Sequence, residues 1–284
     1  MTPAGIVAVA GSVVSVFAVI RRPSRSQRNW SQFALAMASW GGLWFAGSSA
    51  FAKDGMSNLA VHMVGHIILM FMVPMGLVFS GAARSTWWLL NRSTRRRLLR
   101  WWYVDRRWRV PRWLAHPFTA ALVMNGVMVA SHTPVVFDAV MEHTWAMDWI
   151  MEPAFVLSGL FFFHFILSSP PRKNHVRLRY QLVMVLFTMV EMVVLAMSMA
   201  IFSHTSWYSV MQPVAGATTM TGMHASSMAQ AFQQQQLAAA ILWICGDFWA
   251  VPCVIEIVRR VVAREGSVFG ALDRTSEQFL TKAS

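Results

Sequence analysis

Charged residues and cysteines are scarce in this 284-residue chain, and each scarcity excludes a class of protein. Only 13% of the residues are charged, about half the share found in a soluble domain, which excludes an ordinary cytosolic enzyme. Cys245 and Cys253 form no CxxC pair and are too few for a disulfide-stabilised secreted domain. The sequence also has no GxSxG, P-loop, HExxH or CxxCH motif, so we predict a protein that is not an enzyme.

Hydrophobic residues make up 56% of the chain and are concentrated in long runs. A helix needs about 17–25 mostly apolar residues to cross a hydrocarbon core of ~30 Å. Lipid does not tolerate exposed backbone polar groups, so runs of this composition predict helices rather than barrel strands. We therefore predict an all-α integral membrane protein with seven transmembrane helices. Their approximate ranges are 4–20, 33–51, 59–81, 114–131, 149–168, 180–202 and 237–258.

The basic residues predict the orientation of these helices. Of the 24 Lys and Arg residues, all except Lys53 fall in alternate loops or in the C-terminal tail. Because cytoplasmic loops are enriched in Lys and Arg, the N-terminus is predicted to lie outside and the C-terminus in the cytoplasm. Residues 1–258 then form one transmembrane domain and residues 259–284 a basic cytoplasmic tail. The predicted location is the plasma membrane, crossed many times.

The formal net charge of +12 raises the question of a nucleic-acid partner. Loop 82–113 carries Arg95, Arg96 and Arg97 among six tryptophans, a composition that also suits base stacking. A segment between two spans, however, meets anionic lipid first, and basic amphipathic segments bind such surfaces. We therefore predict the lipid bilayer as the partner, and no nucleic acid.

Six of the nine histidines lie at or beyond the predicted outer face of the membrane. His62 and His66, four residues apart, share one face of the third span. Imidazole and thioether together suit copper, and thioether selects Cu(I). His62, His66, His132 and His143 are therefore the candidate metal ligands, with copper as the candidate cofactor. The alternative is ordinary: interfacial histidines often bond a carbonyl, and methionine is a flexible apolar filler.

Three acidic residues are predicted to lie within the spans, where carboxylates are costly. Glu152 opens the fifth span, while Glu191 and Asp247 lie near the middle of the sixth and seventh. Neither of these two spans contains a Lys or Arg that could pair with them. Each acid is therefore protonated as an interhelical hydrogen-bond donor, faces a polar cavity, or touches a metal or a partner.

Several short motifs occur in a characteristic order along the chain. His62-Met63-Val64-Gly65-His66 is followed by Pro74 and Gly81. His116-Pro117 opens the next span, and His132-Thr133-Pro134 closes it. Gln234-Gln235-Gln236-Leu237-Ala238-Ala239 leads to Trp243. Over residues 55–258 this pattern resembles the CtaG-type membrane family of cytochrome c oxidase assembly factors, the type associated with caa-type oxidases and built from seven spans.

The resemblance implies an assembly factor in the plasma membrane of a bacterium, with cytochrome c oxidase subunits as partners. It would present copper near the outer face or assist the assembly of an oxidase subunit. The sequence departs from the family pattern in two places, and each departure removes candidate metal ligands that the resemblance would imply. Trp149-Ile150-Met151-Glu152-Pro153 keeps the acid of an HxxEH-like family element without its histidines, and Gln234 replaces a usual acid. His143 and the methionine-rich outer loop are then the substitutes.

Two other functions remain open from the sequence. A b-type haem could bind between histidines on different helices, for which His66 and His132 form the only plausible pair. A transporter of copper or protons could instead use Glu191 and Asp247. An optical haem spectrum and flux in liposomes distinguish these alternatives from an assembly factor.

Overall fold

The structure is a computed structural model that describes residues 2–20, 30–82, 89–97, 116–167, 178–208 and 221–265. The described residues are almost all helical, and no strand occurs among them. The named helices are α1 Pro3–Ile20, α2 Trp30–Ala46, α3 Ser49–Ser57, α4 Leu59–Ile67, η2 Ile68–Met72, α5 Val73–Phe79, α8 Pro117–His132, α9 Pro134–Glu142, α10 Thr144–Ala146, η4 Met147–Met151, α11 Glu152–Leu167, α12 Leu178–Ala200 and α13 Thr221–Glu265, where η marks a π-helical turn.

The predicted all-α class is confirmed, and several helices suit a membrane. Within the described part of the chain, four segments are long and apolar enough to cross one, and α8 with α9 makes a fifth if this bent pair is one span. The four are Leu59–Phe79, Met147–Leu167, Tyr180–Ala200 and Met228–Ala263. The first two predicted spans correspond to α1 and α2, of 18 and 17 residues. These two are helices near the lower limit of spanning length.

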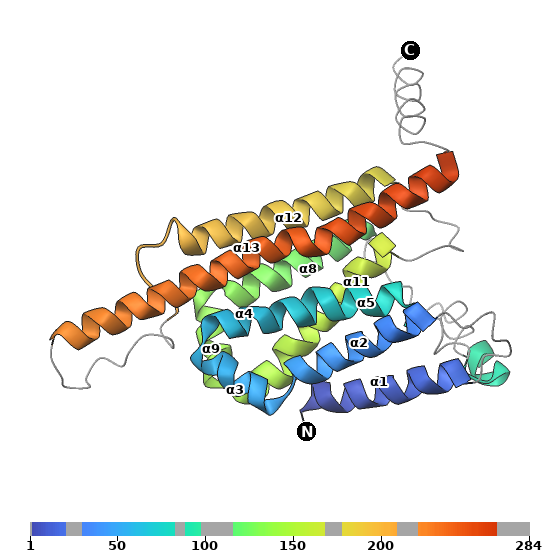
Figure 1. The fold of residues 1–284 in the computed structure, drawn as a ribbon, viewed down its shortest axis with the longest axis horizontal. Helices are drawn as coiled ribbons and strands as arrows, with labels where there is room; N and C mark the ends of the chain where they lie inside the picture. Colours follow the sequence, from blue (N-terminus) through green and yellow to red (C-terminus); the bar gives the residue numbers. More distant parts are fainter. Residues whose placement is uncertain are drawn as a thin grey trace, which may run out of the picture.

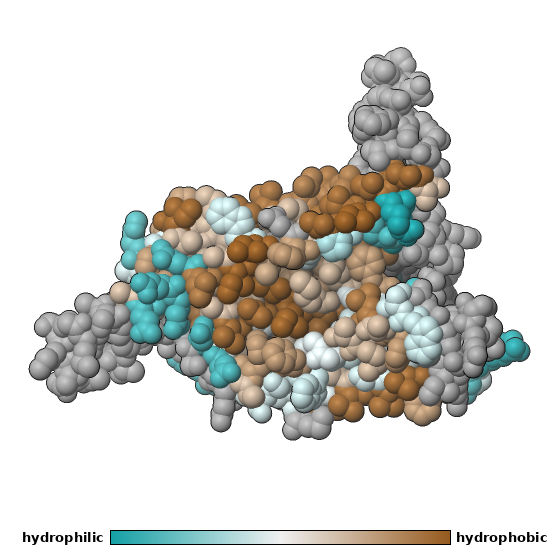
Figure 2. Space-filling view, in the orientation of Figure 1, coloured by the Kyte–Doolittle hydropathy of each residue, from teal (hydrophilic) through white to brown (hydrophobic). Residues whose placement is uncertain are grey.

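The long helices run alternately in opposite directions (Figure 1). The segment α4–η2–α5 lies at the centre, where α4 packs on α13 and α5 packs on α2 and α11. Helices α12 and α13 lie side by side along one flank, and α1 and α2 along the other. Apolar side chains cover the middle of the face drawn in Figure 2, with hydrophilic ones gathered towards its two ends. This distribution suits a bundle surrounded by lipid.

Two predicted boundaries are wrong. The span 33–51 is interrupted after Ala46, because Ser48 caps a new helix by accepting a hydrogen bond from the Phe51 amide at 3.3 Å. The predicted outer loop 203–236 is helical from Thr221, where α13 begins. Its Ala, Gln and Met residues are good helix formers, which explains the extension. Residues 209–220, including Met211 and Met220 of the methionine-rich loop, lie outside the described residues.

Two π turns occur among the described residues, and each ends two residues before a proline. The turn η2 precedes Pro74, and η4 precedes Pro153. Proline has no N–H, so the usual bond back to the fourth preceding carbonyl is lost, and a wider turn accommodates the defect. At η2 the carbonyl freed by Pro74 is that of Met70. Gly159 of α11 packs directly on it, since a Cβ there would collide with the Met70 oxygen and lie 2.7 Å from Pro74 Cγ.

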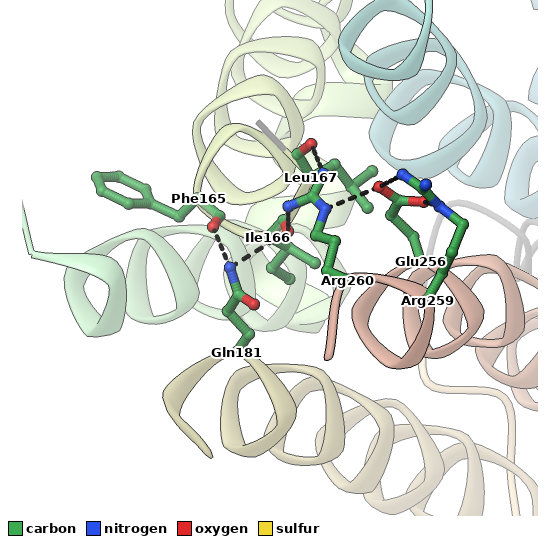
Figure 3. A network of polar contacts seen from close by, with 7 residues as sticks. All are labelled: Phe165, Ile166, Leu167, Gln181, Glu256, Arg259 and Arg260. Carbon is green, nitrogen blue, oxygen red and sulfur yellow. Dashed lines mark hydrogen bonds and ion pairs between the residues drawn. The ribbon is translucent and has the colours of Figure 1, made fainter. Parts of the chain in front are cut away.

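The C-terminal end of α11 is held by side chains from two other helices (Figure 3). The last carbonyls of a helix have no partner within it and need donors from outside. Gln181 Nε2 of α12 donates at 3.2 and 3.4 Å, and Arg260 of α13 donates through both terminal nitrogens, Nη1 at 3.2 Å. Glu256 orients Arg260 by accepting from its Nε at 2.7 Å. The accepting carbonyls are those of Phe165, Ile166 and Leu167.

Candidate functional site

The structure brings together three of the four histidines predicted as metal ligands. The ring centroids of His62 and His66 are 4.3 Å apart, and those of His66 and His132 are 5.4 Å apart. All three side chains are buried, with exposed fractions of 2%, 5% and 2%. We call these residues the histidine cluster.

Local sequence places each histidine. Asn58 caps α4 by accepting hydrogen bonds from the amides of Ala60 and Val61, so His62 and His66 lie in the first two turns, on one face. On the other helix, Pro134 starts α9, and the chain bends by 72° between α8 and α9. Because residues before proline avoid the helical conformation, α8 ends at His132, beside α4.

The ring nitrogens of His62 and His66 are buried without hydrogen-bond partners. Within the described chain, neither Nδ1 nor Nε2 of either ring meets a donor or an acceptor. An unpaired buried polar group costs about 1–3 kcal/mol, and such groups are rare in folded proteins. A pair of adjacent buried rings with all four nitrogens unpaired is therefore unusual, and its nitrogens are available to a ligand.

His132 has one nitrogen engaged and the other directed at sulfur. Its Nδ1 lies 2.7 Å from the carbonyl oxygen of Met128, and since a carbonyl only accepts, Nδ1 carries the proton. Its Nε2 lies 3.2 Å from Met63 Sδ. Both of these atoms offer electron pairs, so their contact becomes favourable only with a proton or a cation against them. A backbone carbonyl that fixes the tautomer is also the usual support of a metal-binding histidine.

Aromatic rings enclose the histidine cluster. Phe137 packs edge-on against His62 at 5.2 Å, and Phe155 packs against His66 at 4.4 Å. Tyr208 lies against Phe137 and donates a hydrogen bond to the backbone oxygen of His132 at 3.3 Å. Burial and then the Asp138 carboxylate raise the pKa of the Tyr208 phenol, which therefore remains a hydrogen-bond donor. These rings exclude water and lower the dielectric around the cluster.

The remaining predicted residues are placed differently. His143 is exposed, with its Nδ1 3.1 Å from the Ala139 oxygen, and lies outside the cluster. Glu152 is 4% exposed and its Oε2 has no partner in the described chain. Glu191 on α12 is half-buried, with both carboxyl oxygens likewise unpaired there. The side chain of Asp247 lies outside what the structure describes.

No ready-made metal cage of oxygen, nitrogen and thiol ligands is present in the described chain. There, no group of three or more His, Cys, Asp or Glu side chains is arranged to hold a metal ion. The Met63 thioether beside His132 is a donor of another type. Thioether is a ligand that suits soft metals.

The cavity at the histidine cluster measures about 20 Å³, which is room for one water-sized sphere. Sites for larger organic ligands measure about 300–1,000 Å³. The rings of His66 and His132, the predicted haem pair, are only 5.4 Å apart and nearly perpendicular, which leaves no space for a haem between them.

Sequence reasoning did not identify Met147, Met151 or Tyr208 as residues near the site. Met147 and Met151 line the cavity together with His62, His66 and Glu152. Their spacing of four residues, ending next to an intramembrane acid, was an available signal. Tyr208 follows the sixth span in a loop, and no pattern in that loop indicates its contact with His132.

Three comparisons with known proteins complete the description. A family model described as cytochrome c oxidase caa3 assembly factor matches residues 13–264, most of the chain. No curated protein and no solved structure matches the chain.

Proposed function

Since the chain belongs to the cytochrome c oxidase caa3 assembly factor family, we propose that its histidine cluster holds copper on the way to the oxidase. Copper is the cargo in this proposal, not a resident cofactor. The chain binds and releases it without catalysing a reaction. The observation that supports the proposal most directly is the set of four unpaired ring nitrogens on His62 and His66.

The donors of the cluster suit copper in its reduced state. Imidazole nitrogen and thioether sulfur are ligands that Cu(I) accepts, whereas Mg²⁺ and Ca²⁺ require oxygen ligands. His132 offers Nε2 beside Met63 Sδ, and its Nδ1–H is held by the Met128 carbonyl. The surrounding Phe137 and Phe155 rings keep the site dry. Such an enclosure would protect Cu(I) from water and from oxidants.

The proposal includes seven spans, with the N-terminus and the histidine cluster towards the outside of the plasma membrane. The antiparallel arrangement of the long helices supports it, because α1, α5, α11 and α13, the helices that precede the basic segments of the sequence, all finish at the same end of the bundle (Figure 1). Reporter fusions test it, and a cytoplasmic signal after Glu142 would contradict seven spans. We expect cytoplasmic signals after Arg28, Arg97 and Arg264, and external signals after Asp54, Glu142 and Gln212.

Replacing His62 and His66 with alanine is expected to lower copper retention at least about tenfold. Both donors of the α4 face are then lost, while the substitutions leave no charged group unpaired. The measurement is copper per purified protein after dialysis, together with the oxidase of the same cells. That oxidase should contain its haem and lack copper.

His143→Ala is the matched control, because His143 is exposed and lies outside the cluster. It should retain as much copper as the wild type. The comparison is made at equal amounts of membrane-inserted protein, since loss of the protein imitates loss of the site. Fully copper-loaded oxidase in cells carrying the double substitution would contradict copper delivery and leave assistance by protein contact.

A further inference from the structure

A small chamber lies beside the histidine cluster, between α3, α4 and the segment η4–α11. His62, Gly65 and His66 of α4 form one wall of its lining. The opposite wall comes from η4 and the start of α11, which contribute Met147, Met151 and Glu152. The chamber thus gathers donors from two spans that are far apart in the sequence.

The wall from η4 and α11 carries donors of its own. Glu152 is 4% exposed, and its Oε2 has no hydrogen-bond partner among the described residues. Met151, which carries a thioether, is 6% exposed and directly precedes Glu152 in the sequence. Consecutive residues of a regular α-helix point about 100° apart. The π turn that ends at Met151 brings both side chains into the chamber lining.

Two glycines leave the chamber its space. A Cβ on Gly55 would lie 3.7 Å from His62 Nδ1, and one on Gly65 would lie 3.0 Å from Phe51 Cε1. The volume of about 20 Å³ admits one water-sized sphere, too little for an ion with its hydration shell. An ion in this space has to be bare and must take all its ligands from the walls.

The charge of the walls selects the valence of that ion. Among the residues whose side chains the structure describes, Glu152 is the only acidic one that lines the chamber, and none of them is a Lys or Arg. The other donors are imidazoles and thioethers, which bind a metal without adding charge. One carboxylate with a monovalent cation gives a neutral pair, whereas a divalent cation leaves a net positive charge buried in low dielectric. Burying an uncompensated charge costs several kcal/mol.

We propose that Met147, Met151 and Glu152 form the second wall of a site for one monovalent soft cation, with His62 and His66 as the first. The proposal rests on the proposed function, and it adds which further residues bind and which cations they accept. Soft thioether ligands favour Cu(I) over Na⁺ or K⁺, and the single carboxylate favours Cu(I) over Zn²⁺ or Cu²⁺.

The test is Cu(I) binding by the purified full-length protein in competition with a colorimetric Cu(I) chelator. Glu152→Gln keeps the shape of the side chain and removes its charge, and Met147→Leu with Met151→Leu removes both sulfurs. We expect each variant to raise the Kd for Cu(I) by about tenfold or more. Met184→Leu is the matched control, because Met184 is equally buried on α12 and does not line the chamber. Its Kd should stay within about twofold of the wild type.

Selectivity is measured by adding Zn²⁺ to the same preparation. We expect the protein to retain Zn²⁺ far more weakly than Cu(I). Retention of Zn²⁺ as tight as that of Cu(I) would overturn the preference for a monovalent ion. Thermal unfolding of each variant checks its fold. If Glu152→Gln does not fold, the methionine pair tests the second wall alone.

The outcomes separate this inference from the proposed function. Loss of Cu(I) in the His62→Ala/His66→Ala protein, with wild-type affinity in the Glu152 and methionine variants, overturns the second wall and leaves the histidine cluster standing. Wild-type affinity in the histidine variant as well would overturn both.

Discussion

Gly159→Ala is expected to destabilise the protein by about 3 kcal/mol or more, the upper end of the cost of inserting a methyl group into a packed core. The added Cβ would collide with the backbone oxygen of Met70 and crowd the ring of Pro74, 2.7 Å away. Neither group can rotate aside, because one is backbone and the other a proline. The helices α5 and α11 must separate instead. The midpoint of thermal unfolding in detergent measures the effect.

Gly126→Ala is the matched control, since it makes the same change within a helix. Gly126 is exposed on α8, and a Cβ there would meet nothing within 4 Å. Alanine is the better helix former, so this variant should be neutral or up to about 1 kcal/mol more stable. Equal unfolding midpoints for the two variants would show that α11 does not approach the Met70 carbonyl closely.

Gln235→Leu is expected to cost about 2–3 kcal/mol and to lower copper retention as well. Gln235 is fully buried on α13, and its side chain accepts from the Trp207 amide at 2.6 Å. It also donates to the Met199 carbonyl at 2.8 Å and to Ser203 Oγ at 2.9 Å. These bonds hold the segment that ends at Tyr208. Leucine has nearly the same volume but leaves the Trp207 amide without a partner.

The effect on copper follows from the position of Tyr208. Its hydroxyl donates to the backbone of His132, and its ring covers Phe137 above His62. Loosening the segment therefore opens the histidine cluster to water. Gln236→Leu provides the control, because Gln236 is exposed on the next position of the same helix and should change stability by less than about 0.5 kcal/mol. If both leucine variants have the same unfolding midpoint as the wild type, Gln235 does not hold the segment that ends at Tyr208.

The sequence predicted the helical class and the apolar part of the long helices that the structure describes, because apolar length is a strong local signal. It did not predict where helices break. The interruption between Ala46 and Ser48 depends on a cap, and the π turns before Pro74 and Pro153 depend on what packs against the freed carbonyls. At Pro74, Gly159 of another helix packs on the freed Met70 carbonyl, and periodicity within one helix carries no information about such a contact.

The candidate site could be predicted in part. The spacing of His62 and His66 places them on one helix face, and this needed no tertiary information. The approach of His132 to Met63 required the packing of α8 against its neighbours, which sequence spacing does not give. His143 illustrates the opposite error: it lies near His132 in the predicted topology, yet α9 turns it to solvent.

Arg260 and Gln181 donate hydrogen bonds to the last carbonyls of α11. These bonds also determine how the chamber at the other end of that helix can open. Because its C-terminal end is hydrogen-bonded to α12 and α13, a tilt of α11 away from α4 would have its pivot near Leu167. Its 16 residues give a lever arm of roughly 24 Å. A tilt of about 5° then displaces Glu152 by about 2 Å, which is the length of one metal–ligand bond.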